Sequence, residues 1–181
     1  MIVKVEQIFD ELFDTIPIYD GNNKLFFGYG EQKELNAILL ARQKNGNPCY
    51  PLLWYNLPNT LEGNKIYSEG NCDFVLAYNT TGDLFNDQRF TQIFNEILFP
   101  HFSLVIQALE KANGISVLNI SEDKKWKTTN YPNYGSPTTF EGKKQQKQVD
   151  IWDAVGFTLK LNIRKDACRF DQIIYNTNNL K

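Results

Sequence analysis

The sequence is poor in the side chains that carry metal and nucleophilic chemistry. It has one histidine, His101, and three cysteines among 181 residues. One imidazole, with no Ser or Cys in a recognisable nucleophile motif and no second histidine, gives little support to a catalytic triad or a His-based metal site. Cys49, Cys72 and Cys168 are odd in number and far apart, which excludes a disulfide framework and a C-x-x-C zinc site. We therefore expect reduced, partly buried thiols, a structural His101 and no cofactor.

Long apolar runs and a basic excess are missing as well. No segment approaches the ~20 apolar residues that cross a bilayer, and the first residues lack the basic start and apolar run of a signal peptide. We expect no membrane partner and a chain that is made and kept in the cytosol of its cell. The chain has 19 Lys+Arg and 21 Asp+Glu, a net charge of -2. This balance argues against a dedicated nucleic-acid binder, which normally needs a clear excess of cations.

What is present is a series of helical and strand patterns. Apolar residues recur at helical spacing over 3–15, 31–43 and 90–112. In the last of these, Pro100 either kinks the helix at Phe99 or divides it there. Strands are predicted over 25–27, 50–56, 72–78, 115–120 and 149–163, with a further short one at 170–175. The chain is thus predicted to be a single α+β domain, 1–181. Its mixed, mainly antiparallel sheet carries two N-terminal helices and one long helix.

One segment, 121–148, has almost no aliphatic residues and is predicted to be an extended loop. It holds six Lys and three acidic residues, so it carries +3 while the other 153 residues carry -5. A loop this long inside a compact domain is uncommon unless it has a function of its own or is disordered. Aromatic residues alternate with its lysines, which fits either stacking on single-stranded nucleic acid or a protein-contacting arm. We favour the arm, with these contact residues: Lys125, Trp126, Lys127, Tyr131 and Tyr134. The last residues, 176–181, form a polar tail.

Two catalytic alternatives rest on short motifs. Asp73, Glu122 and Lys124 could serve a small Mg²⁺-dependent nuclease, because an acidic pair holding Mg²⁺ beside a lysine suits attack on phosphate. The E-x-K spacing recurs at 141–143, so the motif is not specific. Gly28-Tyr29-Gly30 lies where a phosphate-binding loop would, but its third glycine is replaced and Glu31 would repel a phosphate. We expect no enzymatic activity.

Four blocks, in this order, carry a resemblance to a known class of proteins. They are Tyr50-Pro51-Leu52-Leu53-Trp54, the helix 90–100, Tyr131-Pro132-Asn133-Tyr134-Gly135-Ser136-Pro137, and Asp150-Ile151-Trp152-Asp153-Ala154-Val155. In this order of elements, over about 3–165, the chain resembles small virion proteins of tailed bacteriophages. The resemblance is to tail terminators and head–tail neck-ring (tail completion) proteins of Bacteroidetes phages or prophages.

This resemblance implies a virion structural protein, assembled in the cytoplasm of the bacterial host, that forms a homo-oligomeric ring at the head–tail junction or tail end. The implied partners are further copies of the chain, portal or connector proteins and tail-tube proteins. Packaged DNA would only pass through the lumen. Residues 142–147 are more basic than that family leads us to expect, so the loop could meet either protein or DNA.

Overall fold

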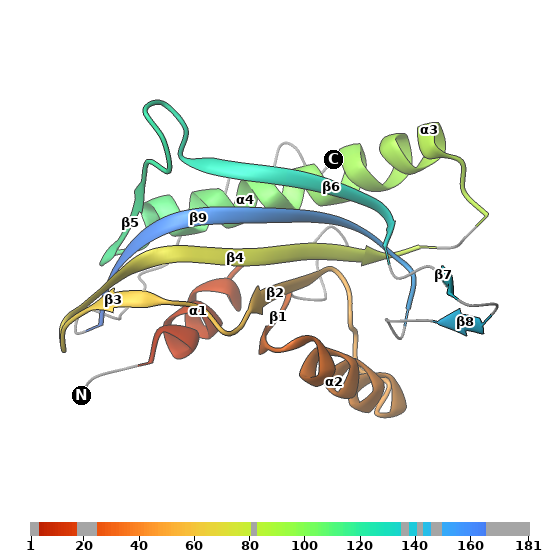
Figure 1. The fold of residues 1–181 in the computed structure, drawn as a ribbon, viewed down its shortest axis with the longest axis horizontal. Coiled ribbons are helices and arrows are strands. Elements are labelled where there is room, and N and C mark those ends of the chain that lie inside the picture. The colour runs from red at the N-terminus through yellow and green to blue at the C-terminus, as the bar shows by residue number, and fades with distance from the viewer. Residues whose placement is uncertain are drawn as a thin grey trace.

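The computed structural model describes residues 4–17, 25–80, 83–134, 138–140, 143–145 and 150–165. It confirms the predicted α+β class, with a mixed and mainly antiparallel sheet (Figure 1). The strand order is β1-β2-β4-β9-β5, with β3 also paired to β4 and β6 also paired to β9. Of the described strand pairs, β1 and β2 run parallel and the others antiparallel. The strands are β1 Phe26–Gly30, β2 Leu52–Asn56, β3 Leu61–Gly63, β4 Tyr67–Asn79, β5 Ile115–Leu118, β6 Trp126–Tyr134 and β9 Trp152–Arg164.

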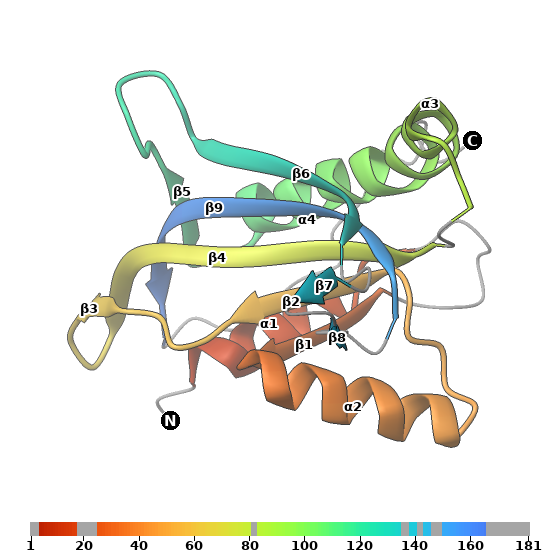
Figure 2. The ribbon, with the colours of Figure 1, turned by 45° about the vertical axis from the view of Figure 1, so that its right-hand side comes forward.

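The middle of the sheet is a long antiparallel ladder between β4 and β9. Each strand has 13 residues, and they pair without interruption from Tyr67 opposite Arg164 to Asn79 opposite Trp152. Side chains alternate between the two faces of such a ladder. We call one face the core face because it packs against α1 (Val5–Phe13) and α4 (Phe99–Lys111). The opposite face packs against α2 (Gln32–Lys44) and is called the α2 face (Figure 2).

The helices form where the apolar spacing predicts them. α1 turns Val5, Ile8, Phe9, Leu12 and Phe13 toward the core face, all of them buried. Its acidic residues lie on the other side, as an amphipathic helix requires. α2 contributes little more than Leu35 and Leu39 to the interior. It therefore covers only one end of the α2 face.

The long helix before β5 is continuous but changes its hydrogen bonding at Phe99. α3 (Asn86–Arg89) runs into the π-helix η1 (Phe90–Leu98) and then into α4. The amide of Phe99 donates to the carbonyl of Phe94, five residues back. Pro100 has no amide hydrogen, and its ring would clash with the carbonyl four residues earlier in an α-helix. The wider π turn removes that conflict, so the helix continues past the proline.

The prediction of an extended loop over 121–148 is wrong for much of its length. Trp126–Tyr134 is strand β6, paired with β9, and Thr138–Phe140 and Lys143–Gln145 form a small hairpin, β7–β8. β6 has no aliphatic alternation because it is an edge strand, and every residue in it except Asn133 is exposed. β3, also unpredicted, lies in the polar connection before β4. The predicted strand at 170–175, the tail 176–181 and Cys168 lie outside the described residues.

Candidate interaction site

The five predicted contact residues do not form one surface, because β6 alternates between the two faces. Trp126 lies on the core-face side, where its ring meets Phe102 edge-on at a centroid distance of 6.1 Å. Tyr131 and Tyr134 lie together on the α2 face, with ring centroids 5.6 Å apart. The Lys125 ammonium lies 2.7 Å from the Glu110 carboxylate. Lys127 is exposed and pairs across the ladder with Thr158.

Tyr131 and Tyr134 form one wall of a groove between β6 and α2. The other wall comes from Gln32 and Leu35 near the start of α2. The groove has a volume of about 290 Å³. No charged side chain is among the described residues that line it, which are Gln32, Leu35, Trp54, Asn56, Val75, Tyr131, Tyr134, Trp152 and Ala154. We call it the α2–β6 groove.

Two buried tryptophans are fixed beneath the groove. The Trp54 indole N–H donates to the Gly30 carbonyl at 3.1 Å. The Trp152 indole N–H donates to the Tyr50 hydroxyl at 2.7 Å, and that hydroxyl donates to the Asp150 carboxylate at 2.6 Å. Burial, and then the bond to Asp150, raise the pKa of Tyr50 above its ordinary value. Because each polar edge has a partner, the indole rings present rigid apolar surface to the groove.

The tyrosine wall depends on the absence of a side chain beneath it. The Tyr131 ring lies across Gly156 of β9, and a Cβ atom there would come within 2.8 Å of its Cε2. The Tyr134 ring stacks on Trp152 at 6.0 Å with an interplanar angle of 23°. Both tyrosines remain 40% exposed. The groove is thus built from ring contacts, with two half-exposed aromatic rings left at its rim.

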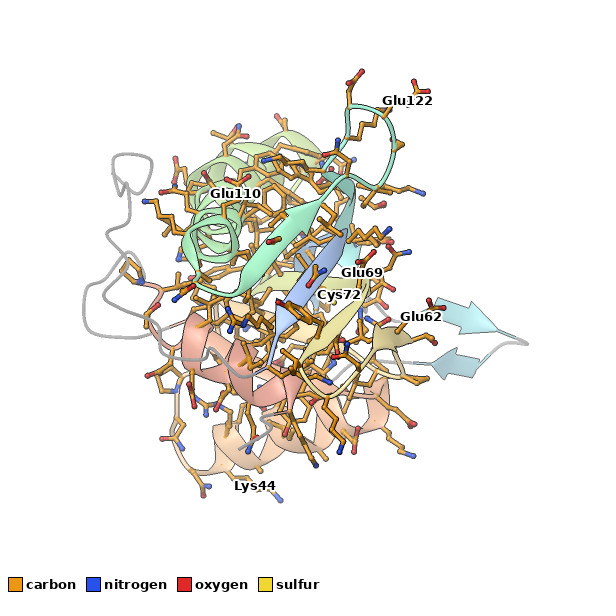
Figure 3. All side chains as sticks on the ribbon, turned by 90° about the vertical axis from the view of Figure 1, so that its left-hand side faces the viewer. Lys44, Glu62, Glu69, Cys72, Glu110 and Glu122 are labelled. Atoms are coloured by element: carbon orange, nitrogen blue, oxygen red, sulfur yellow. The ribbon has the colours of Figure 1, made fainter. Side chains whose placement is uncertain are left out.

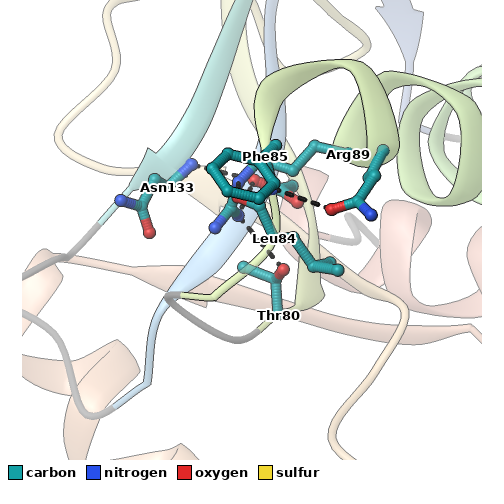
Figure 4. Close-up of polar contacts among 7 residues, drawn as sticks. Thr80, Leu84, Phe85, Arg89 and Asn133 are labelled. Atoms are coloured by element: carbon teal, nitrogen blue, oxygen red, sulfur yellow. Dashed lines mark hydrogen bonds and ion pairs between the residues drawn. The ribbon is translucent and has the colours of Figure 1, made fainter.

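A buried ion pair lies at the same end of the sheet, on the core-face side. The guanidinium Nη1 of Arg89 donates to Asp153 Oδ1 at 2.9 Å, and the two side chains are 2% and 0% exposed. Arg89 also donates to the Leu84 carbonyl at 3.0 Å and to the Thr80 hydroxyl at 3.2 Å. The backbone N–H of Asn133 donates to the same Asp153 oxygen at 2.8 Å (Figure 4). One carboxylate therefore joins β9, the end of β6 and the segment leading into α3.

The residues of the nuclease alternative lie on separate elements. Asp73 is in the middle of β4, where it accepts a hydrogen bond from the Thr158 hydroxyl. Glu122 and Lys124 lie in the loop between β5 and β6. Figure 3 shows Glu122 at the outer end of that loop, away from Cys72, the residue before Asp73. In the described part of the chain, no three His, Cys, Asp or Glu residues are grouped as metal ligands would be.

The remaining candidate residues are buried in the core or belong to a helix cap. The His101 ring is 1% exposed, and its Nδ1 lies 2.7 Å from the Ile97 carbonyl. This contact requires a proton on Nδ1, and burial lowers the pKa of the imidazole. Cys72 is buried beside the Tyr55 hydroxyl, and burial raises its thiol pKa to about 12. At Gly28-Tyr29-Gly30, the following helix start is capped by its own Glu31 and Glu34.

Sequence reasoning found the two tyrosines but missed the rest of the site. Trp54 and Trp152 are contributed by strands on either side of β4, which the sequence does not show to be neighbours. None of the described helices is long and apolar enough to cross a membrane. Comparison with family models, with curated proteins and with solved structures finds no match for this chain. The phage resemblance therefore stays a prediction from the sequence.

Proposed function

We propose that this chain is a non-enzymatic virion structural protein that forms a homo-oligomeric ring at the head–tail junction or tail end of a tailed phage. The observation that carries the proposal is the pair of half-exposed tyrosines on the rim of the α2–β6 groove. Aromatic residues with rigid support are the usual energetic centre of a protein interface. Further copies of the chain, portal or connector proteins and tail-tube proteins are the proposed partners.

The free edge of β6 supports the same function and suggests how the contact is made. β6 pairs with β9 on one side, and its other side pairs with none of the described strands. Exposed edges invite further strands unless charge, proline or a bulge blocks them. β6 carries Lys127, Pro132 and a register shift between Tyr131 and Tyr134. We therefore propose docking through side chains at the Tyr131 end of β6 rather than extension of the sheet along its whole edge.

The decisive measurement is the mass of the purified protein in solution, by light scattering and native mass spectrometry, together with electron microscopy. We expect a closed ring, either alone or after mixing with tail-tube or connector protein. A protein that stays monomeric under all these conditions would contradict the proposal.

A matched pair of variants tests the surface. The double substitution Tyr131→Ala and Tyr134→Ala should weaken assembly at least ~10-fold while leaving the monomer folded, because both rings are partly exposed. Tyr67→Ala is the control, since Tyr67 is 44% exposed and lies outside the lining of the groove. The control should assemble normally.

Incubation of the protein with Mg²⁺ and plasmid should leave the DNA intact. Cleavage that Asp73→Ala abolishes would favour the nuclease instead.

A further inference from the structure

Tyr131 and Tyr134 are three positions apart on β6, and yet their rings lie together on one face of the sheet. In a regular strand, side chains three positions apart point to opposite faces. The register of β6 changes between the two tyrosines, since Tyr131 pairs with Ala154 and Tyr134 pairs with Trp152. β6 therefore carries one extra residue at this point, a β-bulge. The tyrosine wall of the α2–β6 groove depends on this bulge.

The bulge places the β6 backbone in an uncommon conformation. Pro132 and Asn133 lie opposite the single residue Asp153 of β9. Pro132 has no backbone N–H to donate to the ladder. Asn133 has a φ of 57°, a left-handed conformation that asparagine tolerates better than most other residues. In the part of the chain that the structure describes, it is the one non-glycine residue with a positive φ. A specific contact is needed to stabilise this backbone.

Asp153 supplies that contact. Its Oδ1 accepts the backbone N–H of Asn133 at 2.8 Å and the Nη1–H of Arg89 at 2.9 Å (Figure 4). The Asp153 side chain is 0% exposed, so water does not compete for this oxygen. Because an inward N–H without a partner is unfavourable, the carboxylate favours the bulged backbone over a regular strand.

The effect of Asp153 reaches the opposite face of the sheet. Asp153 lies on the core-face side and is not among the residues that line the groove. The bulge nevertheless directs the Tyr134 ring to the α2 face, where it stacks on Trp152 at 6.0 Å and meets Tyr131 at 5.6 Å. A regular strand would direct the Tyr134 ring to the core-face side. A buried carboxylate on one face thus determines an exposed aromatic surface on the other.

We propose that Asp153 is a positioning residue for the α2–β6 groove. Its Oδ1 holds the bulge at Asn133 and so places Tyr134 beside Tyr131, and Arg89 fixes the carboxylate in position. The inference rests on the proposed function in taking the two tyrosines as the contact surface. The placement of the Tyr134 ring itself can be measured whether or not the protein assembles.

Two uncharged double variants separate the acceptor oxygen from the ion pair. Arg89→Met with Asp153→Leu removes both charges and the acceptor. Arg89→Gln with Asp153→Asn also removes both charges but keeps a carbonyl oxygen for the N–H of Asn133. 3-Fluorotyrosine at position 134 reports by fluorine NMR whether the ring stacks on Trp152, because a stacked indole shifts the fluorine resonance.

The two double variants should differ in the groove against the order of their stabilities. Arg89→Gln with Asp153→Asn should keep the wild-type fluorine resonance and the wild-type association. Arg89→Met with Asp153→Leu should lose that resonance and associate at least ~10-fold more weakly. Its thermal stability should nevertheless be at least that of the other double variant, because it buries no polar group in place of the ion pair. A purely structural role of Asp153 would give the opposite order.

A second pair of variants acts on the bulge from β6 and leaves the ion pair unchanged. Asn133→Gly should keep the resonance and the association, because glycine adopts a positive φ readily. Asn133→Val should lose both, because a β-branched residue strongly disfavours this conformation. This pair decides the question if a double variant does not fold.

The outcomes separate this inference from the proposed function. An unchanged resonance in Arg89→Met with Asp153→Leu or in Asn133→Val, or an equal loss in both double variants, would show that Asp153 does not position Tyr134. If the resonances respond as expected but Tyr131→Ala with Tyr134→Ala leaves assembly intact, the positioning role stands and the tyrosines are not the contact surface. If the resonances respond as expected in a wild-type chain that never assembles, the positioning role stands and the proposed function fails.

Discussion

The two faces of the sheet are formed by the same strands but are covered by helices to different extents. The core face is covered along its length by α1, η1 and α4, and nearly every side chain directed to it is buried. The α2 face is covered at one end, and beyond it β4 and β9 present Glu69, Asn71, Asp73, Lys160 and Asn162 beside an open polar hollow. Stability is thus concentrated on one face. The other face is left with the groove and with surface available to partners.

The largest difference in stability between the two faces is expected at two adjacent residues of β4. Phe74 is buried on the core face, where its ring meets those of Phe9, Phe13, Tyr55 and Phe157. Phe74→Ala should lower the free energy of unfolding by about 3–5 kcal/mol. Asp73→Ala, on the α2 face, should change it by less than about 1 kcal/mol. Urea unfolding of both variants measures the difference, and equal losses would show that the faces are not distinct in stability.

A somewhat smaller loss is expected at the buried ion pair. Arg89→Met leaves the Asp153 carboxylate buried with only part of its compensation, and this should cost about 3 kcal/mol. The backbone N–H of Asn133 still donates to Asp153, which limits the loss. The double variant with Asp153→Leu should recover much of the stability, because no uncompensated charge remains. No recovery in thermal unfolding would indicate that the pair itself stabilises the fold.

The burial of the core face can be tested through the titration of His101. Burial lowers the pKa of His101 in the folded protein below its value in the unfolded chain, so the unfolded state binds the proton more readily. The contribution of the neutral imidazole is complete above about pH 6.5 and is lost as the pH falls below that value. His101→Leu should flatten the dependence of stability on pH between 7 and 5. Parallel pH profiles for the variant and the wild type would show that His101 does not titrate on unfolding.

The smallest effect on stability is expected at an exposed ion pair on the protein surface. Lys125 and Glu110 form an ion pair whose side chains are 48% and 39% exposed. Such pairs contribute about 0.2–1 kcal/mol, and salt screens them. Lys125→Ala should therefore change stability by no more than that at low salt and by almost nothing at 1 M NaCl. A loss comparable to that of Arg89→Met would mean that this pair is less solvated than its exposure indicates.

Apolar periodicity predicted most of the fold, and it failed where an element has no apolar stripe. The helices and the buried strands appear close to their predicted ranges because their packing requires the pattern. β6 was missed because an exposed edge strand needs no such stripe. Of its predicted contact residues, Tyr131 and Tyr134 meet, but Trp126 faces the other way because side chains alternate along a strand.

The buried ion pair leaves one signal in the sequence, a charged residue inside an apolar strand pattern. Asp153 is in phase with Val155 and Phe157, so a charge occupies a core-facing position of β9. β9 nevertheless runs through this position without interruption. A buried carboxylate in phase with apolar neighbours requires a cation or several donors. The cation that pairs with Asp153 could not be predicted. Arg89 is 64 positions away, and the sequence does not show which helix crosses that end of the sheet.

The unbroken pairing of β4 with β9 also determines where the length of this chain can vary. An inserted or deleted residue inside either strand would exchange the two faces for every residue beyond it, placing Phe157 and Leu159 in water and Lys160 in the core. The β5–β6 loop imposes no such constraint. Natural variants of this protein should therefore keep the spacing of both long strands fixed and differ in length at this loop.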